Sequence, residues 1–250
     1  MHIISIGSSS KGNSTLIYND DTTILVDCGI AVKTIKSITN RETFNALFIT
    51  HEHSDHIKNA GPFGRATKTP IYVSDLVIKK LEAKNPRFFE GCTLREINDV
   101  SSYTVGSFTI TPFSTKHDAA QAFGFKIKDK DGEICYLTDT GSISKRMMDM
   151  IKGSNNLFIE CDYDEELLRD YEEYDDELKQ RISSDFGHLS TQQMLELIET
   201  LGVDTLNKVI VGHLSERTNT PEKVKERIAA KFPNHIDKFI VTPYTGVIDL

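Results

Sequence analysis

The pattern His-x-His-x-Asp-His at residues 51–56 constrains this chain more than any other part of its sequence. It packs three imidazoles and an aspartate into six residues, directly after the apolar stretch Ala46–Ile49. Side chains alternate along an extended backbone, so His51 and His53 point the same way and can bind one ion, while Asp55 and His56 lie just beyond the turn and can reach a second. The pattern therefore predicts a two-metal site. An ordinary polar loop after a strand predicts no such arrangement.

Three further candidate ligands follow apolar runs elsewhere in the chain. His117 comes after Phe108–Phe113, Asp139 after Ile134–Thr138 and His213 after Val209–Gly212. Each position corresponds to the carboxyl end of a strand, where a crevice is expected. We assign three imidazoles to one ion, namely His51, His53 and His117. The second ion receives Asp55, His56 and His213. Asp139 is predicted to bridge the two ions.

Such a centre acidifies a water molecule shared between the ions, which predicts a metal-bridging hydroxide as the nucleophile of a hydrolase. The histidine-rich ligand set suits Zn²⁺, and Mn²⁺ or Fe²⁺ also match it. Asp27, which ends the run Ile24–Val26, is predicted to orient a ligating histidine rather than to bind metal. An ordinary turn aspartate is the alternative for Asp27.

Length and composition indicate a single globular domain spanning residues 1–250, since 38% of the residues are hydrophobic and 26% are charged. The start of the chain lacks a basic segment followed by a long apolar one, and no stretch is apolar enough to cross a bilayer. We therefore expect a cytoplasmic protein. Its four cysteines are scattered without Cys-x-x-Cys pairs, which argues against disulfides and zinc knuckles. The oligomeric state is left open.

The formal charge of −8 comes from one segment. Residues 162–177 hold ten acidic residues and one arginine, Arg169, and the rest of the chain sums to +1. Overall acidity therefore does not exclude a nucleic-acid partner. The segment is interpreted as a solvated helix face or a flap, and an acidic gate or partner surface is the alternative.

The first half of the chain alternates strand patterns with polar turns, whereas the second half alternates strands with helices. The predicted strands are 3–5, 15–18, 23–26, 46–49, 71–73, 104–111, 124–127, 134–137, 156–159 and 208–211. The predicted helices are 76–83, 145–152, 191–201 and 221–231. A capping box at Ser190–Gln193 and the pair Thr220–Pro221 mark two helix starts.

These ligand candidates, in this order and with Asp27 ahead of them, resemble the metallo-β-lactamase-fold hydrolase superfamily. The similarity runs from residue 1 to at least residue 220. The resemblance implies an α/β fold of four layers, αββα, in which two mixed β-sheets pack face to face with helices outside and metals along one edge. Members of the superfamily cleave many kinds of substrate, so the motif does not identify the reaction.

Five shorter motifs resemble the YycJ/WalJ branch of that superfamily. They are Gly7–Ser14, His117–Ala119, Thr138–Gly141, Gly187–Ser190 and Gly212–Ser215. This branch is associated with 5′-to-3′ exonuclease activity on DNA. The chain departs from the branch after Glu160, where Cys161-Asp162-Tyr163-Asp164 replaces the usual Ser-Asn-His-Asp, and Thr191 and Thr220 stand where Asn is usual. The Tyr163 departure affects one edge of the expected pocket and no metal ligand.

The layout of Glu160, His188 and His213 is also similar to the tRNA 3′-processing ribonucleases of this fold. By that likeness Glu160 and His188 form a pair that protonates the leaving oxygen. Together with Asp55, they are the predicted catalytic residues. A strand-end glutamate and a helix-entry histidine without catalytic roles are the alternatives.

Two weaker patterns concern the substrate. The loop Gly7–Ser14 is rich in small and hydroxyl residues, and phosphate contacts are predicted at Ser8, Ser9, Lys11 and Asn13. A tight turn between strands is the alternative for this loop. Basic residues near the predicted helix 76–83 are a second candidate contact for a phosphate backbone, namely Arg65, Lys68, Lys79, Lys80, Lys84 and Arg87.

The sequence thus predicts a dinuclear metal-dependent phosphodiesterase, most consistent with a 5′-to-3′ exonuclease whose partner is nucleic acid. The enzyme alternatives are a hydrolase of a cyclic nucleotide, ester or thioester on the same metals, and an RNA-processing endoribonuclease. A metal-bound adaptor without activity ranks last, because an adaptor has no need of a complete ligand set.

Overall fold

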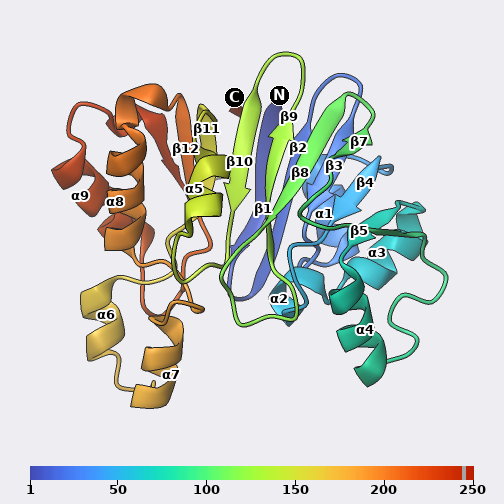
Figure 1. The fold of residues 1–250 in the computed structure, drawn as a ribbon, viewed down its shortest axis with the longest axis horizontal. Coiled ribbons are helices and arrows are strands. Elements are labelled where there is room, and N and C mark those ends of the chain that lie inside the picture. Colours follow the sequence, from blue (N-terminus) through green and yellow to red (C-terminus); the bar gives the residue numbers. More distant parts are fainter. Residues whose placement is uncertain (244–245) are drawn as a thin grey trace.

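The computed structural model describes residues 1–243 and 246–250 and shows four layers, with two β-sheets face to face and helices on both outer sides (Figure 1). The first sheet contains β1 (His2–Ser9), β2 (Gly12–Tyr18), β3 (Thr23–Val26), β4 (Ala46–Phe48), β5 (Ile71–Val73), β6 (Leu94–Glu96) and β14 (Ile248–Asp249). The second contains β7 (Tyr103–Val105), β8 (Phe108–Ser114), β9 (Phe123–Lys128), β10 (Glu133–Leu137), β11 (Asn156–Glu160), β12 (Lys208–Gly212) and β13 (Phe239–Val241).

The strand order is β14-β1-β2-β3-β4-β5-β6 in the first sheet and β13-β12-β11-β10-β9-β8-β7 in the second. Both sheets are mixed, because hairpins such as β2–β3 and β9–β10 are antiparallel whereas β3–β4 and β10–β11–β12 are parallel. The predicted αββα sandwich is confirmed. The polar segments 19–21 and 128–132 join these antiparallel pairs.

Helices of the first half are α1 (Val32–Thr39), α2 (Ser54–Ile57), α3 (Ala60–Thr67) and α4 (Asp75–Lys84). Those of the second half are α5 (Lys145–Ile151), α6 (Glu165–Asp170), α7 (Asp176–Ile182), α8 (Thr191–Leu201) and α9 (Pro221–Lys231), with short 3₁₀ turns η1 (Val203–Thr205) and η2 (Ile236–Lys238). The predicted capping box opens α8, and Thr220 caps α9 by accepting a hydrogen bond from the Lys223 amide.

One predicted strand is wrong. Residues 104–111 form two antiparallel strands, β7 and β8, instead of one. The chain turns at Gly106, whose φ of +55° lies in the left-handed region that favours glycine. A Cβ at Gly106 would also come within 2.1 Å of the Thr22 hydroxyl. A single glycine within a β-branched run was an insufficient turn signal for the sequence prediction.

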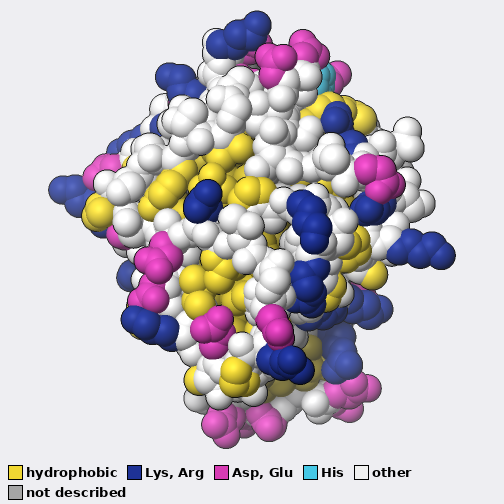
Figure 2. All heavy atoms as spheres, turned by 90° about the vertical axis from the view of Figure 1, so that its right-hand side faces the viewer, with side chains coloured by type: hydrophobic (Ala, Val, Ile, Leu, Met, Phe, Trp, Pro, Cys, Tyr) yellow, Lys and Arg dark blue, Asp and Glu magenta, His cyan; other side chains and the backbone are white. Residues whose placement is uncertain are grey.

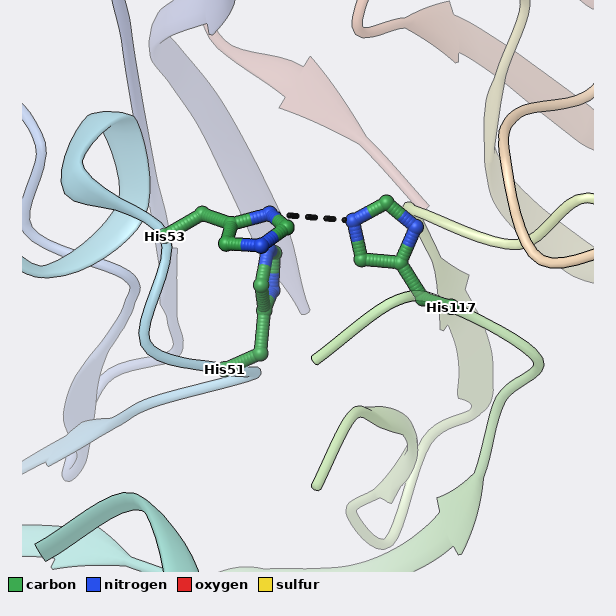
Figure 3. Close-up of side chains that lie close together, drawn as sticks. All are labelled: His51, His53 and His117. Atoms are coloured by element: carbon green, nitrogen blue, oxygen red, sulfur yellow. Dashed lines mark hydrogen bonds between the residues drawn. The ribbon is translucent and has the colours of Figure 1, made fainter. Parts of the chain in front are cut away.

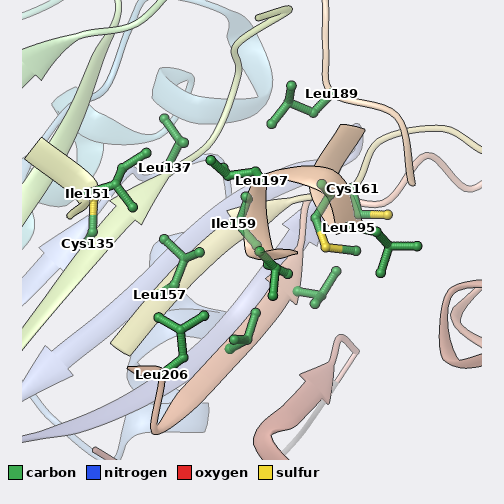
Figure 4. Packing of buried hydrophobic residues seen from close by; sticks show 14 of the residues in the cluster. Cys135, Leu137, Ile151, Leu157, Ile159, Cys161, Leu189, Leu195, Leu197 and Leu206 are labelled. Carbon is green, nitrogen blue, oxygen red and sulfur yellow. The ribbon is translucent and has the colours of Figure 1, made fainter. Parts of the chain in front are cut away.

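Three apolar layers hold the sandwich together. The central layer lies between the sheets and includes Phe48, Phe125 and Phe158. A second layer packs α5, α8 and α9 against the second sheet (Figure 4), and a third packs α1, α3 and α4 against the first. Each fully buried large side chain contributes about 1.5–3 kcal/mol through water exclusion. Both sheets share the central layer, and the single domain stays a prediction.

None of the helices in residues 1–243 and 246–250 is both long and apolar enough to cross a membrane.

The connection after β3 packs tightly on α2, which carries two of the candidate ligands. The Cys28 amide donates to the His56 carbonyl at 2.7 Å, and the Gly29 amide donates to the Asn13 carbonyl at 2.8 Å. A Cβ at Gly29 would lie 1.6 Å from the Asp55 carbonyl oxygen. This position has room for glycine alone, so the ligand-bearing turn depends on it.

We predict that Gly29→Ala lowers the free energy of unfolding by about 2–3 kcal/mol, because the backbone of α2 must move away. Urea denaturation measures this effect. Gly132→Ala is the matched control, since a Cβ at Gly132 meets nothing within 4 Å. Equal stability of the two variants would contradict the account of this contact.

Candidate metal centre

The candidate site lies where strands of both sheets end at one edge of the sandwich, the edge that carries α2 in Figure 1. Most functional candidates come shortly after the carboxyl end of a strand or just before a helix, whereas Asp55 and His56 lie within α2. The first sheet contributes Asp27 after β3 and His51, His53, Asp55 and His56 after β4. The second contributes His117, Asp139, Glu160, His188 and His213. Because β10, β11 and β12 are parallel and in register, Asp139, Glu160 and His213 reach the same edge.

The first group of donors consists of the imidazoles of His51, His53 and His117 (Figure 3). One nitrogen from each residue lies within 4.8 Å of the others. His53 Nδ1 and His117 Nε2 are 3.1 Å apart. The His117 ring is oriented by its Nδ1, which contacts the Gly187 carbonyl at 3.0 Å. The structure therefore brings together the three residues that were assigned to one ion.

The second group consists of Asp55, His56 and His213. Asp55 Oδ2 lies 3.2 Å from His56 Nε2 and 3.7 Å from His213 Nε2. The side-chain amide of Asn13 completes this corner, donating to Asp55 Oδ2 at 2.9 Å. These are the residues that were assigned to the second ion.

Asp139 lies between the two groups. Its Oδ1 is 3.7 Å from His117 Nε2 and 3.6 Å from His213 Nδ1, while its Oδ2 is 3.3 Å from His56 Nε2. The side chain is almost completely buried. One carboxylate thus contacts both groups, which is the position that a bridging ligand requires.

Two buried polar atoms test whether these residues suit a metal. Within the described part of the chain, His51 Nε2 and Asp139 Oδ2 have no hydrogen-bond partner. A buried polar atom without a partner is costly, and a metal ion supplies the missing interaction. Imidazole nitrogens and carboxylate oxygens are also the donors that zinc and similar divalent ions prefer. The cluster is therefore suited to metal ions.

The charges within the cluster are strongly coupled. Burial favours the neutral form of Asp139, but the imidazoles of His213 and His56 lower the pKa of this carboxyl well below its usual value. Burial likewise disfavours a charged His56, yet Asp139 and Asp27 raise the pKa of His56 to about 10. The carboxylates thus draw positive charge into the cluster, which divalent cations would also provide.

Asp27 does not face the cluster directly but contacts His56 from behind. Its Oδ2 lies 2.7 Å from His56 Nδ1, and its Oδ1 accepts from the Thr50 amide at 2.8 Å. The Thr50 hydroxyl donates to the same carboxylate. With Nδ1 held by Asp27, the Nε2 atom of His56 is directed into the cluster, which is the arrangement expected of a residue that orients a ligand.

Three residues of the site have an unusual backbone. Asp27, Asp139 and His213 have φ values of +61°, +56° and +51°, in the left-handed region that few residues other than glycine adopt. Asp27 and His213 directly follow β3 and β12, and Asp139 comes two residues after the end of β10. Such strain persists only where the surrounding structure enforces it, and it concentrates at functional sites.

Glu160 and His188 lie next to the cluster. Glu160 Oε2 contacts His188 Nδ1 at 3.0 Å and His213 Nδ1 at 3.4 Å, while Oε1 accepts from the Thr140 amide at 2.6 Å. Burial favours a neutral Glu160, but the hydrogen bond from His188 lowers its pKa. Burial disfavours a charged His188, but Asp162 and Glu160 raise its pKa to about 9. These carboxylates therefore favour the protonated form of His188.

The four residues predicted to contact phosphate are engaged within the protein. Ser8 Oγ accepts from the His213 amide at 2.6 Å, and Asn13 contacts Asp55 and His56. Ser9 and Lys11 both contact Glu216. Their phosphate-binding role stays a prediction, and Ser8 and Asn13 also help to shape the metal cluster.

A crevice of about 180 Å³ opens onto the cluster. Besides the candidate residues its lining includes Ser10, Asp162, Tyr174, Ile182 and Ser215. Ser10, Asp162 and Ser215 belong to motifs described above, whereas the sequence analysis gave Tyr174 and Ile182 no individual role. Tyr174 and Ile182 belong to the acidic segment and to α7, which no motif connects with the metal ligands. Only the placement of that segment in the fold reveals their role in the crevice.

Three of the six basic residues around α4 are paired with nearby acidic residues. Lys79 pairs with Asp75, Lys80 with Glu52 and Arg87 with Glu90. Figure 2, which shows the side of the molecule on the right in Figure 1, has Lys and Arg side chains interspersed with acidic and hydrophobic ones. A phosphate backbone would have to compete with these acidic partners.

Comparison with known families agrees with this geometry. The model of the Beta-lactamase superfamily domain matches residues 22–213, which include every candidate metal ligand. The chain belongs to the β-lactamase superfamily. Its two sheets and flanking helices are those of the metallo-β-lactamase fold, and the protein is a metal-dependent hydrolase.

Within this superfamily the chain is similar to named exonucleases. It is 34% identical over 224 residues to the exodeoxyribonuclease WalJ of Streptococcus pneumoniae, covering 87% of this chain and 82% of the relative. It is 27% identical over 240 residues to the exodeoxyribonuclease YycJ of Bacillus anthracis, covering 92% and 88%. The predicted likeness to the YycJ/WalJ branch is confirmed. The crystal structure of YhfI from Bacillus subtilis, a metallo-β-lactamase-fold protein, superimposes with a TM-score of 0.77 at 20% identity over 99% of both chains.

Asp27→Asn tests the orientation of His56. Asparagine tolerates the positive φ at this position, but its amide would donate to His56 Nδ1 and move the ring proton to Nε2, which then cannot bind metal. We predict a metal affinity about 10- to 100-fold weaker, measured by competition with a chromophoric chelator.

Asp249→Asn is the matched control for this variant. Asp249 makes a similar contact with His2 Nδ1, at 2.6 Å, but the two side chains lie outside the candidate centre. The control should bind metal like the wild type. Unchanged affinity in Asp27→Asn would show that Asp27 does not orient a ligand.

Proposed function

We propose that the protein is a dinuclear metal-dependent phosphodiesterase, a nuclease that removes nucleotides from DNA in the 5′-to-3′ direction. The arrangement of Glu160 and His188 beside Asp139 carries this proposal, because it adds a proton donor to a metal centre. The names of the WalJ and YycJ relatives support DNA as the substrate. The grouping of donors on either side of Asp139 supports two ions.

In this proposal His51, His53 and His117 hold one ion, Asp55, His56 and His213 hold the other, and Asp139 contacts both. When bound, divalent ions such as Zn²⁺ or Mn²⁺ lower the pKa of water and offset negative charge on the attacked phosphoryl group. The burial of the ligands and the Asp27 contact keep the donors in place before substrate arrives.

His188 supplies the proton that the leaving oxygen requires. Its Nδ1 is held by Glu160, so Nε2 is the atom that can donate into the crevice. Glu160 itself is fixed by the amides of Thr140 and Leu189. The pair therefore stays in position during the reaction, and the negative charge of Glu160 stabilises the protonated imidazole.

The most direct test of the activity uses single- and double-stranded DNA and RNA with 5′-phosphate or 5′-hydroxyl ends, incubated with Mn²⁺ or Zn²⁺. Stepwise release of nucleotides from the 5′ end of DNA is expected. Release from the 3′ end would contradict the proposed direction, and internal cleavage of RNA would favour an endoribonuclease.

The crevice itself favours one other candidate, a hydrolase of a cyclic nucleotide or another small ester or thioester. Part of the acidic segment forms the wall of the crevice, and its carboxylates repel a long polyanion more than a small ester or thioester. Turnover of such a compound, with no cleavage of any nucleic acid, would establish this alternative.

The role of His188 is tested with two leaving groups. We predict that His188→Ala slows cleavage of an oligonucleotide about 10²- to 10³-fold, because a sugar hydroxyl leaves poorly without a proton. Hydrolysis of a p-nitrophenyl nucleotide ester should fall less than about tenfold, since p-nitrophenolate needs no proton to leave. Rates are measured at matched metal content.

Asp139→Ala is the companion variant and should lose activity on both substrates, because it removes the carboxylate common to both metal groups. Equal losses for both leaving groups in His188→Ala would contradict the proton-donor role. Full activity of Asp139→Ala would overturn the metal assignment.

A further inference from the structure

The acidic segment lies beside the candidate metal centre. Residues 164–184, here called the acidic hairpin, form α6, a linker and α7, which project at the same edge of the sandwich as α2 (Figure 1). Arg181 Nε in α7 donates to Asp118 Oδ2 at 2.6 Å, next to the candidate ligand His117. The Ile182 carbonyl accepts from the His188 amide at 2.9 Å. The acidic hairpin is therefore attached to the metal centre at two points.

Tyr174, in the linker between α6 and α7, lines the crevice together with the candidate ligands. Its ring is half-buried and packs edge-on against Tyr171, with centroids 4.7 Å apart. The guanidinium of Arg217, four residues after His213, lies 5.9 Å from the Tyr174 ring centre. The Tyr174 ring therefore has an aromatic neighbour and a cation close by.

The size of the crevice indicates what this ring contacts. About 180 Å³ is below the range of roughly 300–1,000 Å³ that encloses a small ligand, so the crevice takes the reacting phosphate but not a whole nucleotide. The base attached to this phosphate must then lie outside the crevice, against the residues that line its opening. Aromatic side chains stack on bases of any sequence, and an adjacent arginine adds to this attraction.

The charges on the acidic hairpin limit what else can approach. Exposed carboxylates surround the linker, namely Glu166, Asp170, Glu172, Glu173, Asp175, Asp176 and Glu177. Glu173 lies 4.0 Å from Arg217, so part of this charge is balanced beside Tyr174 itself. A second nucleic-acid strand next to the first would bring its phosphates against the remaining carboxylates, which repel them within a Debye length of about 8–10 Å.

We propose that Tyr174 is the platform on which a base flanking the scissile bond stacks, and that the acidic hairpin restricts the substrate to a single strand. This inference rests on the proposed nuclease function. In this inference the acidic hairpin supplies the Tyr174 ring, which binds a flanking base, and the carboxylates that exclude a second strand.

The stacking is tested by combining two variants with two substrates. The substrates are a single-stranded oligonucleotide with normal bases and one with abasic residues on both sides of the first scissile bond. Tyr174→Ala should raise KM for the normal oligonucleotide about tenfold, with kcat little changed, because stacking contributes to binding. The same variant should act on the abasic oligonucleotide like the wild type. Tyr174→Phe, which keeps the ring, should match the wild type on both.

The outcomes separate this inference from the proposed function. If the wild type cleaves neither these oligonucleotides nor duplex DNA, the nuclease function is wrong and the stacking inference falls with it. If the wild type is active and Tyr174→Ala affects both substrates equally, or neither, the function stands and the inference is wrong. A defect in Tyr174→Phe equal to that of Tyr174→Ala would assign the effect to the hydroxyl and overturn stacking.

The charge barrier is tested with the double variant Glu172→Gln/Glu177→Gln, which removes two exposed carboxylates of the acidic hairpin. The wild type should prefer single-stranded over double-stranded DNA, and this variant should cleave the duplex about threefold faster at low salt. The control Glu82→Gln/Glu96→Gln removes the same charge from exposed positions outside the acidic hairpin and should behave like the wild type. A wild type that prefers duplex DNA, or equal effects of the two double variants, would overturn the barrier.

Discussion

The burial of the Asp139 carboxylate among histidines is the constraint on which the rest of the structure depends. A carboxylate removed from water is costly unless positive charge and hydrogen bonds replace its hydration. The imidazoles of His56, His117 and His213 surround Asp139 at 3.3–3.7 Å, and its Oδ2 atom still lacks a hydrogen-bond partner within the described residues. The cluster is therefore arranged to receive additional cations.

Each sheet supplies a different set of residues to this site. The first sheet supplies the histidine-rich turn after β4 and the Asp27 carboxylate behind it. The second supplies Asp139, Glu160 and His213 from adjacent parallel strands. The residues from the two sheets lie close together because the apolar layer between the sheets holds one sheet against the other. The acidic hairpin adds Tyr174 to the lining of the crevice, so the proposed base contact is separate from the ligand set.

Much of this could be predicted from the sequence, because metal chemistry demands particular residues at strand ends. The spacing from His51 to His56 and the strand-end positions of His117, Asp139 and His213 indicated residues that the structure does bring together. Tyr174 could not be found this way, because a stacking ring needs no fixed neighbours and its place depends on how α6 and α7 fold back. The turn at Gly106 was missed because its φ of +55° and the close approach of Thr22 are features of the folded chain that one glycine in a β-branched run does not indicate.

The central claim is that Asp139 lies between two metal ions held by separate groups of ligands. Anomalous diffraction from crystals grown with Mn²⁺ or Zn²⁺, recorded on both sides of the metal's absorption edge, tests it most directly. The account predicts two anomalous peaks, one among His51, His53 and His117 and the other among Asp55, His56 and His213, with Asp139 in contact with both. A single peak, or ions bound away from Asp139, would contradict it.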